Sequence, residues 1–92
     1  MAITVHIPSP LRQFTNNRAS IAVSSVTTVG DLFTHFETEY PILRERICEA
    51  GGKVRRFVNV YVNAEDIRLL GDLQTPLKDG DEVMIIPSIA GG

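Results

Sequence analysis

Cysteine is scarce in this chain of 92 residues, where Cys48 is the single example. A disulfide needs two thiols, so we expect none within the chain. Structural zinc sites and iron–sulfur clusters need four suitable ligands, which Cys48 together with His6 and His35 cannot supply. The shortage of cysteine therefore excludes a disulfide framework and a cysteine-based metal centre.

Long apolar runs and an excess of positive charge are also missing. The longest uncharged stretch, residues 19–30, is rich in Ser and Thr and too short to span a bilayer. The opening residues have no charged segment followed by an apolar one, so we expect no signal peptide. The formal net charge is −2, which gives no sign of a nucleic-acid partner. We expect a reduced, cytoplasmic protein without membrane or nucleic-acid partners.

The remaining composition is that of a small globular domain, with 43% hydrophobic and 22% charged residues. A domain of this size buries only about 60–65% of its unfolded surface, which leaves little room for an enclosed active site. We expect the chain to divide into a domain over residues 1–87 and a flexible tail over residues 88–92. Nothing in the sequence demands more than a monomer.

Apolar periodicity predicts the order of the elements. Alternation predicts strands at 3–7, 19–23, 57–62 and 82–86, with a short edge strand at 67–70. Thr28 and Asp31 form a capping-box-like start for a helix that runs to Tyr40. Pro41 opens a second short helix, for which Gly51-Gly52 is the predicted stop.

One main helix across a small mixed sheet indicates an α+β fold of the β-grasp type. A single helix cannot cover both faces of the sheet, so one face is left for solvent or binding. We predict that Val58, Val60 and Val62 point toward the helix, because Asn59 and Tyr61 tolerate water better. The outward set would then be a docking face formed by Phe57, Asn59 and Tyr61.

No constellation of catalytic residues accompanies these elements, and we expect no enzyme. No glycine-rich phosphate loop follows a strand, and no histidine or cysteine pair has metal-ligand spacing. We expect His35 to face solvent, His6 to be exposed or hydrogen-bonded, and Cys48 to be a small buried apolar residue. The one basic cluster, Lys53-Val54-Arg55-Arg56, is either a solvated loop or a docking contact for an acidic partner.

The C-terminal residues are unusual because Val83 to Gly92 contains no charged side chain and ends in Gly91-Gly92. Glycine is only 7 of the 92 residues, so chance rarely places two together at the end. The five residues from Ser88 to Gly92 extend at most about 17 Å. A narrow channel in a partner enzyme admits glycine because glycine has no Cβ. The side chains then become gradually larger away from the terminus, at Ala90 and Ile89.

A terminal carboxylate has a pKa of about 3.5 and resists nucleophilic attack until it is activated. Attack on the α-phosphate of ATP gives an acyl-adenylate, from which a sulfur donor displaces AMP. The product is a C-terminal thiocarboxylate. The terminus therefore predicts a carrier that is activated by another protein, with Gly92 as the reactive residue.

Four segments and the C-terminus carry a resemblance to a known family. The chain resembles the ubiquitin-like sulfur carrier proteins of the MoaD/ThiS type, and among them the CysO-like carriers of cysteine biosynthesis. The matching segments are the opening Thr4-Val5-His6-Ile7-Pro8, the strand Phe57-Val58-Asn59-Val60-Tyr61-Val62-Asn63, Glu65-Asp66-Ile67-Arg68, Asp79-Gly80-Asp81 and Ala90-Gly91-Gly92. The similarity covers essentially the whole chain and is weakest at residues 49–54.

The resemblance implies a β-grasp fold and a set of partners. An adenylating enzyme of the ubiquitin-activating type would use ATP on Gly92, with Gly91 beside it. A pyridoxal-phosphate-dependent cysteine synthase would accept the sulfur, and a JAMM-type metalloprotease would release the new cysteine. ATP and pyridoxal phosphate would belong to these partners, and this chain would bind no cofactor or metal.

Four alternatives remain open from the sequence. Within the carriers, no residue excludes the small subunit of molybdopterin synthase or a thiamine-thiazole sulfur carrier. A ubiquitin-like modifier of protein lysines would use the same terminal Gly91-Gly92, because both uses begin with adenylation. A plain interaction module would bind through one sheet face and would not need the terminal glycines.

Overall fold

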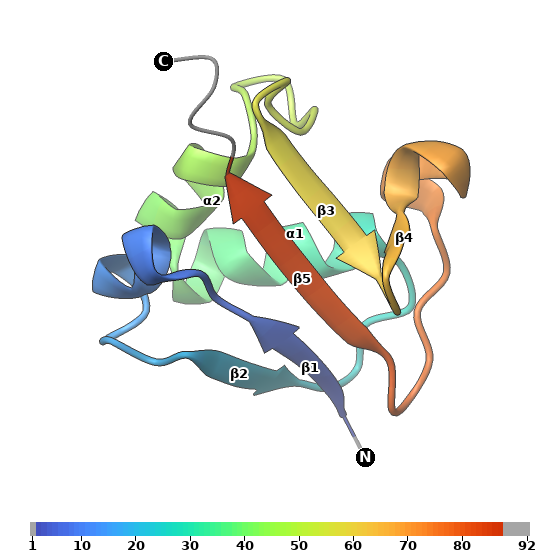
Figure 1. Ribbon diagram of the computed structural model, residues 1–92, viewed down its shortest axis with the longest axis horizontal. Coiled ribbons are helices and arrows are strands. Elements are labelled where there is room, and N and C mark those ends of the chain that lie inside the picture. Colours follow the sequence, from blue (N-terminus) through green and yellow to red (C-terminus); the bar gives the residue numbers. More distant parts are fainter. Residues whose placement is uncertain (1, 88–92) are drawn as a thin grey trace.

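The last strand of the chain lies in the middle of the sheet (Figure 1). A computed structural model describes residues 2–87. It contains one five-stranded sheet with the strand order β2-β1-β5-β3-β4. The strands are β1 (Ile3–His6), β2 (Ser20–Val23), β3 (Val58–Val62), β4 (Glu65–Asp66) and β5 (Glu82–Pro87). The helices are α1 (Val29–Glu39) and α2 (Pro41–Ile47), with 3₁₀ turns η1 (Ser9–Phe14), η2 (Ile67–Leu69) and η3 (Asp72–Gln74).

The sheet is mixed because β5 has neighbours of opposite direction. It runs parallel to β1, with Val5 opposite Val83, and antiparallel to β3, with Val60 opposite Ile85. The first two strands form an antiparallel hairpin, in which Val5 lies opposite Ile21. The β-grasp arrangement predicted from the sequence is confirmed.

Both helices pack on one face of the sheet, and the other face is open (Figure 1). As predicted, the Thr28 hydroxyl accepts a hydrogen bond from the Asp31 amide at 3.1 Å and caps α1. The apolar stripe of α1 is buried against the strands, with Phe36 fully enclosed. The prediction for β3 is also confirmed, since Val58, Val60 and Val62 are at most 6% exposed and face the helices.

Two of the predicted element boundaries are wrong. The second helix ends at Ile47 rather than at Gly51-Gly52, because Cys48 turns into extended backbone and bridges Val54. Gly52, whose φ is 94°, lies in the turn between Cys48 and Val54.

The predicted edge strand at residues 67–70 is also wrong. Asn63 and Ala64 adopt positive φ values of 50° and 71°, which reverse the chain in two residues, so the edge strand is β4. The Asp66 carboxylate then accepts the Arg68 amide at 2.9 Å and starts the η2 turn instead of more strand.

A buried carboxylate fixes the start of β5. Asp81 is 5% exposed and accepts hydrogen bonds from the Asn63 side chain at 2.9 Å and the Lys78 amide at 3.0 Å. Burial raises the pKa of Asp81, but these hydrogen bonds and the Lys78 ammonium group outweigh burial and hold the pKa below its ordinary value. Asn63 also accepts the Glu82 amide at 3.0 Å, which joins the two turns at this end of the sheet.

We predict that Asp81→Ala lowers the free energy of unfolding by about 1–3 kcal/mol at pH 7, because two donors lose their acceptor. The folded pKa is depressed, so the contribution of Asp81 is complete above about pH 4 and is lost as the pH falls through the folded pKa. Urea unfolding at a series of pH values measures this difference. Asp79→Ala, in the same turn but exposed, is the matched control. A difference that persists undiminished at pH 2 would contradict the assignment.

Candidate functional site

The predicted reactive residues, Gly91 and Gly92, and the residues behind them, Ala90 and Ile89, lie outside the described residues 2–87. The structure describes the strand that leads to them. Strand β5 is paired with β1 as far as Met84, opposite His6, and with β3 as far as Pro87, opposite Val58. Hydrogen bonding in the sheet therefore holds the chain up to the point at which the described residues end.

The open face of the sheet surrounds β5. We use "open sheet face" for the outward residues of the three middle strands: Thr4, His6, Asn59, Tyr61, Glu82, Met84 and Ile86. Met84 is 46% exposed and Ile86 is 39% exposed, although both are large apolar residues. Such exposed apolar surface is typical of a binding site for another protein.

A hollow of about 460 Å³ marks the centre of this face. Its walls come from three strands and from the turn after β3, and they are formed by His6, Tyr61, Asn63, Ala64, Glu82, Met84 and Ile86. The apolar residues Tyr61, Met84 and Ile86 stand next to the polar pair His6 and Glu82, whose side chains are 2.7 Å apart. The prediction that His6 is hydrogen-bonded is confirmed.

The predicted docking face agrees with this surface in part. Asn59 and Tyr61 lie on the open sheet face, as the orientation of the three valines requires. Phe57 lies one residue before β3, is 47% exposed and carries the Arg56 guanidinium 5.4 Å from its ring centre. The docking role of all three residues stays a prediction.

Sequence reasoning missed Met84 and Ile86 as members of this face. They alternate along β5 with Val83 and Ile85, which are equally apolar. Because residues 83–86 are all apolar, alternation alone does not show which pair faces outward. The helices, which cover one face of the sheet, determine the orientation.

The remaining candidate side chains have structural roles. The prediction for Cys48 is confirmed, because it is 1% exposed and belongs to the core. Burial raises the pKa of the Cys48 thiol, while the guanidinium groups of Arg44 and Arg55 oppose the shift in part. His35 is half-buried rather than fully in solvent, with its ring centre 6.3 Å from that of Phe36.

Residues 2–87 contain neither a metal-binding cluster nor a membrane-spanning helix. Within this range, no three side chains of His, Cys, Asp or Glu are grouped so that they hold a metal ion. The helices of the described range are all too short or too polar to cross a membrane.

The chain is similar to a family model and to several known proteins. The ThiS family model matches residues 5–92. The sulfur carrier protein CysO of Mycobacterium tuberculosis is 43% identical over 94 residues, which cover all of both chains. Small archaeal modifier protein 3 of Haloferax volcanii is 40% identical over 70 residues, or 76% of this chain and 75% of the relative. A chain from the crystal structure of the Amycolatopsis orientalis BexX/CysO complex matches with a TM-score of 0.88 and 38% identity, over 99% of this chain and 100% of that one.

We predict that Cys48 reacts with a thiol reagent on the order of 100-fold more slowly in the native protein than in urea. The thiol is buried and its raised pKa keeps it protonated at neutral pH. Absorbance after addition of an aromatic disulfide measures both rates. Equal rates in the two states would show that Cys48 is an accessible thiol.

Proposed function

Since the chain belongs to the ThiS family of ubiquitin-like proteins, we propose that it is a sulfur carrier that acts through a thiocarboxylate at Gly92. The observation that carries this proposal is the 43% identity, over the whole of both chains, to a protein named as a sulfur carrier. The chain itself is a protein substrate, and partner enzymes carry out the chemistry.

The proposed chemistry has two steps. The Gly92 carboxylate attacks the α-phosphate of ATP in an adenylating enzyme of the ubiquitin-activating type, and pyrophosphate leaves. A sulfur donor then attacks the acyl carbon, the C–O bond to AMP breaks, and a C-terminal thiocarboxylate remains. The protein contributes a carboxylate on a narrow chain end, because Gly91 and Gly92 have no side chains to obstruct a channel.

The fold supports this role through the position of β5. The strand that precedes the terminal segment carries Met84 and Ile86 on the open sheet face. A partner that docks on this face therefore contacts the same strand that leads to its active site. Docking over Tyr61, Met84 and Ile86 would align the terminal segment and reduce the orientational freedom that the reaction must overcome.

The destination of the sulfur is proposed to be cysteine. In this pathway a pyridoxal-phosphate-dependent cysteine synthase accepts the sulfur, and a JAMM-type metalloprotease releases the cysteine from the carrier. The full-length likeness to CysO favours this destination over molybdopterin synthase or thiamine-thiazole synthesis. The proposal includes a cytoplasmic location and a free monomer, with ATP and pyridoxal phosphate bound by the partners.

A ubiquitin-like modifier is the second candidate, favoured by the 40% identity to a protein named as a small archaeal modifier. The two candidates share the adenylation step and differ in the attacking group. A lysine amine gives an isopeptide bond and a ladder of conjugates, whereas a sulfur donor gives a free thiocarboxylate. Immunoblots of native extracts, made before and after thiol treatment, distinguish the two candidates through the presence or absence of the ladder of conjugates.

We predict that the untagged protein gains the mass difference between sulfur and oxygen when incubated with ATP, a sulfide source and its adenylating enzyme. Intact-mass spectrometry measures the product. The matched variant, Gly91→Val, should keep the melting temperature of the parent but lose at least about tenfold in adenylation rate, because the new side chain obstructs the channel. Unmodified parent protein under these conditions would overturn the carrier function, and normal adenylation of Gly91→Val would overturn the narrow-channel argument.

We predict that Tyr61→Asp and Met84→Asp each raise the KM for adenylation about tenfold or more, because a charge is placed in an apolar contact. Ile42→Asp is the matched control, since Ile42 is 47% exposed against 46% for Met84 but lies on α2. Thermal unfolding verifies that all three variants are folded. Activation kinetics of both test variants equal to those of the control would exclude the open sheet face as the docking surface.

A further inference from the structure

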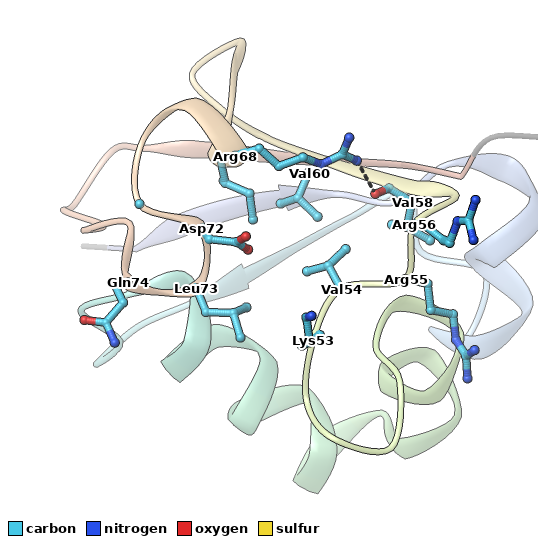
Figure 2. Close-up of a pocket in the computed structure, with 12 residues that line it drawn as sticks. Lys53, Val54, Arg55, Arg56, Val58, Val60, Arg68, Asp72, Leu73 and Gln74 are labelled. Carbon is cyan, nitrogen blue, oxygen red and sulfur yellow. Dashed lines mark hydrogen bonds between the residues drawn. The ribbon is translucent and has the colours of Figure 1, made fainter.

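A second hollow, of about 390 Å³, lies on the helix side of β3 (Figure 2). Its walls come from the segment 53–56, from β3 and from the η2–η3 region. Val54 and Leu73, both half-buried, approach it from different elements, and the inward residues Val58 and Val60 of β3 close it from behind. The hollow thus has an apolar interior.

The rim of this hollow is strongly basic. Of the nine Lys and Arg residues in the chain, four line it: Lys53, Arg55, Arg56 and Arg68. The chain as a whole carries a net charge of −2, so the positive charge is concentrated here against the overall balance. One carboxylate, that of Asp72, also lines the hollow.

The protein leaves most of this charge without an internal counter-charge. Among residues 2–87, the ion pairs of the structure do not include Lys53, Arg55 or Arg56. Arg55 donates to the Glu45 backbone carbonyl at 2.9 Å, and Arg56 lies over the Phe57 ring. Arg68 approaches the Asp66 carboxylate to 3.8 Å, and it donates to the Val58 carbonyl at 3.0 Å and to the Asn59 side-chain oxygen at 2.5 Å.

We propose that this hollow, the basic hollow, docks an acidic polypeptide segment of a partner protein, which inserts one aliphatic side chain between Val54 and Leu73. Carboxylates on either side of that side chain would meet Lys53, Arg56 and Arg68 at the rim. An apolar anchor within a ring of complementary charge is the arrangement common to peptide-binding sites. The Asp72 carboxylate is an acceptor for a peptide N–H.

The observations favour an acidic peptide over a polyanionic nucleic acid. Phosphate backbones bind to extended basic surfaces, often with aromatic side chains for stacking, whereas this hollow has valine and leucine walls. Its volume is at the low end for a small-molecule pocket, which suits one inserted side chain better than a cofactor.

The basic hollow is distinct from the open sheet face. Its β3 residues are Val58 and Val60, which point to the helix side, whereas Asn59 and Tyr61 point to the opposite side. The two surfaces meet at the edge of β3, where Arg68 donates a hydrogen bond to the Asn59 side-chain oxygen. The inference therefore goes beyond the proposed function and does not depend on thiocarboxylate chemistry.

The test uses ¹⁵N-labelled full-length protein and a synthetic amidated peptide in which one leucine is flanked by two glutamates on each side. We expect the peptide to shift the backbone amide signals of Val54, Arg68 and Leu73, and the binding to weaken as salt is added. A peptide with serine in place of leucine should bind at least about threefold more weakly. A single-stranded oligonucleotide of equal charge should leave these amides unshifted.

Arg56→Glu is the test variant, and Arg18→Glu is its matched control with the same change of charge. Arg18 is exposed in the turn before β2 and does not line the hollow. We expect Arg56→Glu to weaken peptide binding about threefold to tenfold and Arg18→Glu to leave it unchanged. The proposal is overturned by shifts confined to the open sheet face, by equal loss in both variants, or by tighter binding of the oligonucleotide.

Discussion

The pairing of β5 with β1 on one side and β3 on the other is the interaction on which the rest of the structure depends. It joins the hairpin at the beginning of the chain to the strands near its end and completes one sheet. The Asp81 side chain joins the start of β5 to Asn63 and Lys78, and its backbone carbonyl accepts a hydrogen bond from the Thr4 amide of β1 at 3.1 Å. The core and the open sheet face both follow from the register of these two pairings.

Alternation along β5 links stability to binding. Val83 and Ile85 are fully buried against the helices, while Met84 and Ile86 are exposed on the open sheet face. A slip of one residue would exchange the two sets and lose both the core and the contact surface. The same alternation along β3 separates the open sheet face from the basic hollow, so a protein of this size presents two surfaces of different chemistry. One is apolar with a polar rim, and the other is apolar with a basic rim.

Local patterns in the sequence predicted the elements whose causes are local. The Thr28 cap, the stripe of α1 and the inward valines of β3 each depend on residues close together in the chain. The parallel pairing of β1 with β5 joins residues far apart, and no local pattern contains it. The sequence predicts the edge strand at residues 67–70, which is too late in the chain. Ala64 adopts a positive φ, which alanine rarely takes, so the chain reverses earlier than its composition suggests. For the site, alternation identified Asn59 and Tyr61, but Met84 and Ile86 needed the position of the helices.

Because strands β1 and β5 are neighbours, the sheet cannot be completed until most of the chain has been synthesised. Strand β1 leaves the ribosome first, yet the edge that it offers to β5 stays unsatisfied until almost the whole chain has emerged. A chain that stops before residue 82 leaves β1 and β3 with unpaired edges and an exposed apolar core. Any protein that recognises the finished sheet therefore selects molecules whose translation has continued at least through Pro87.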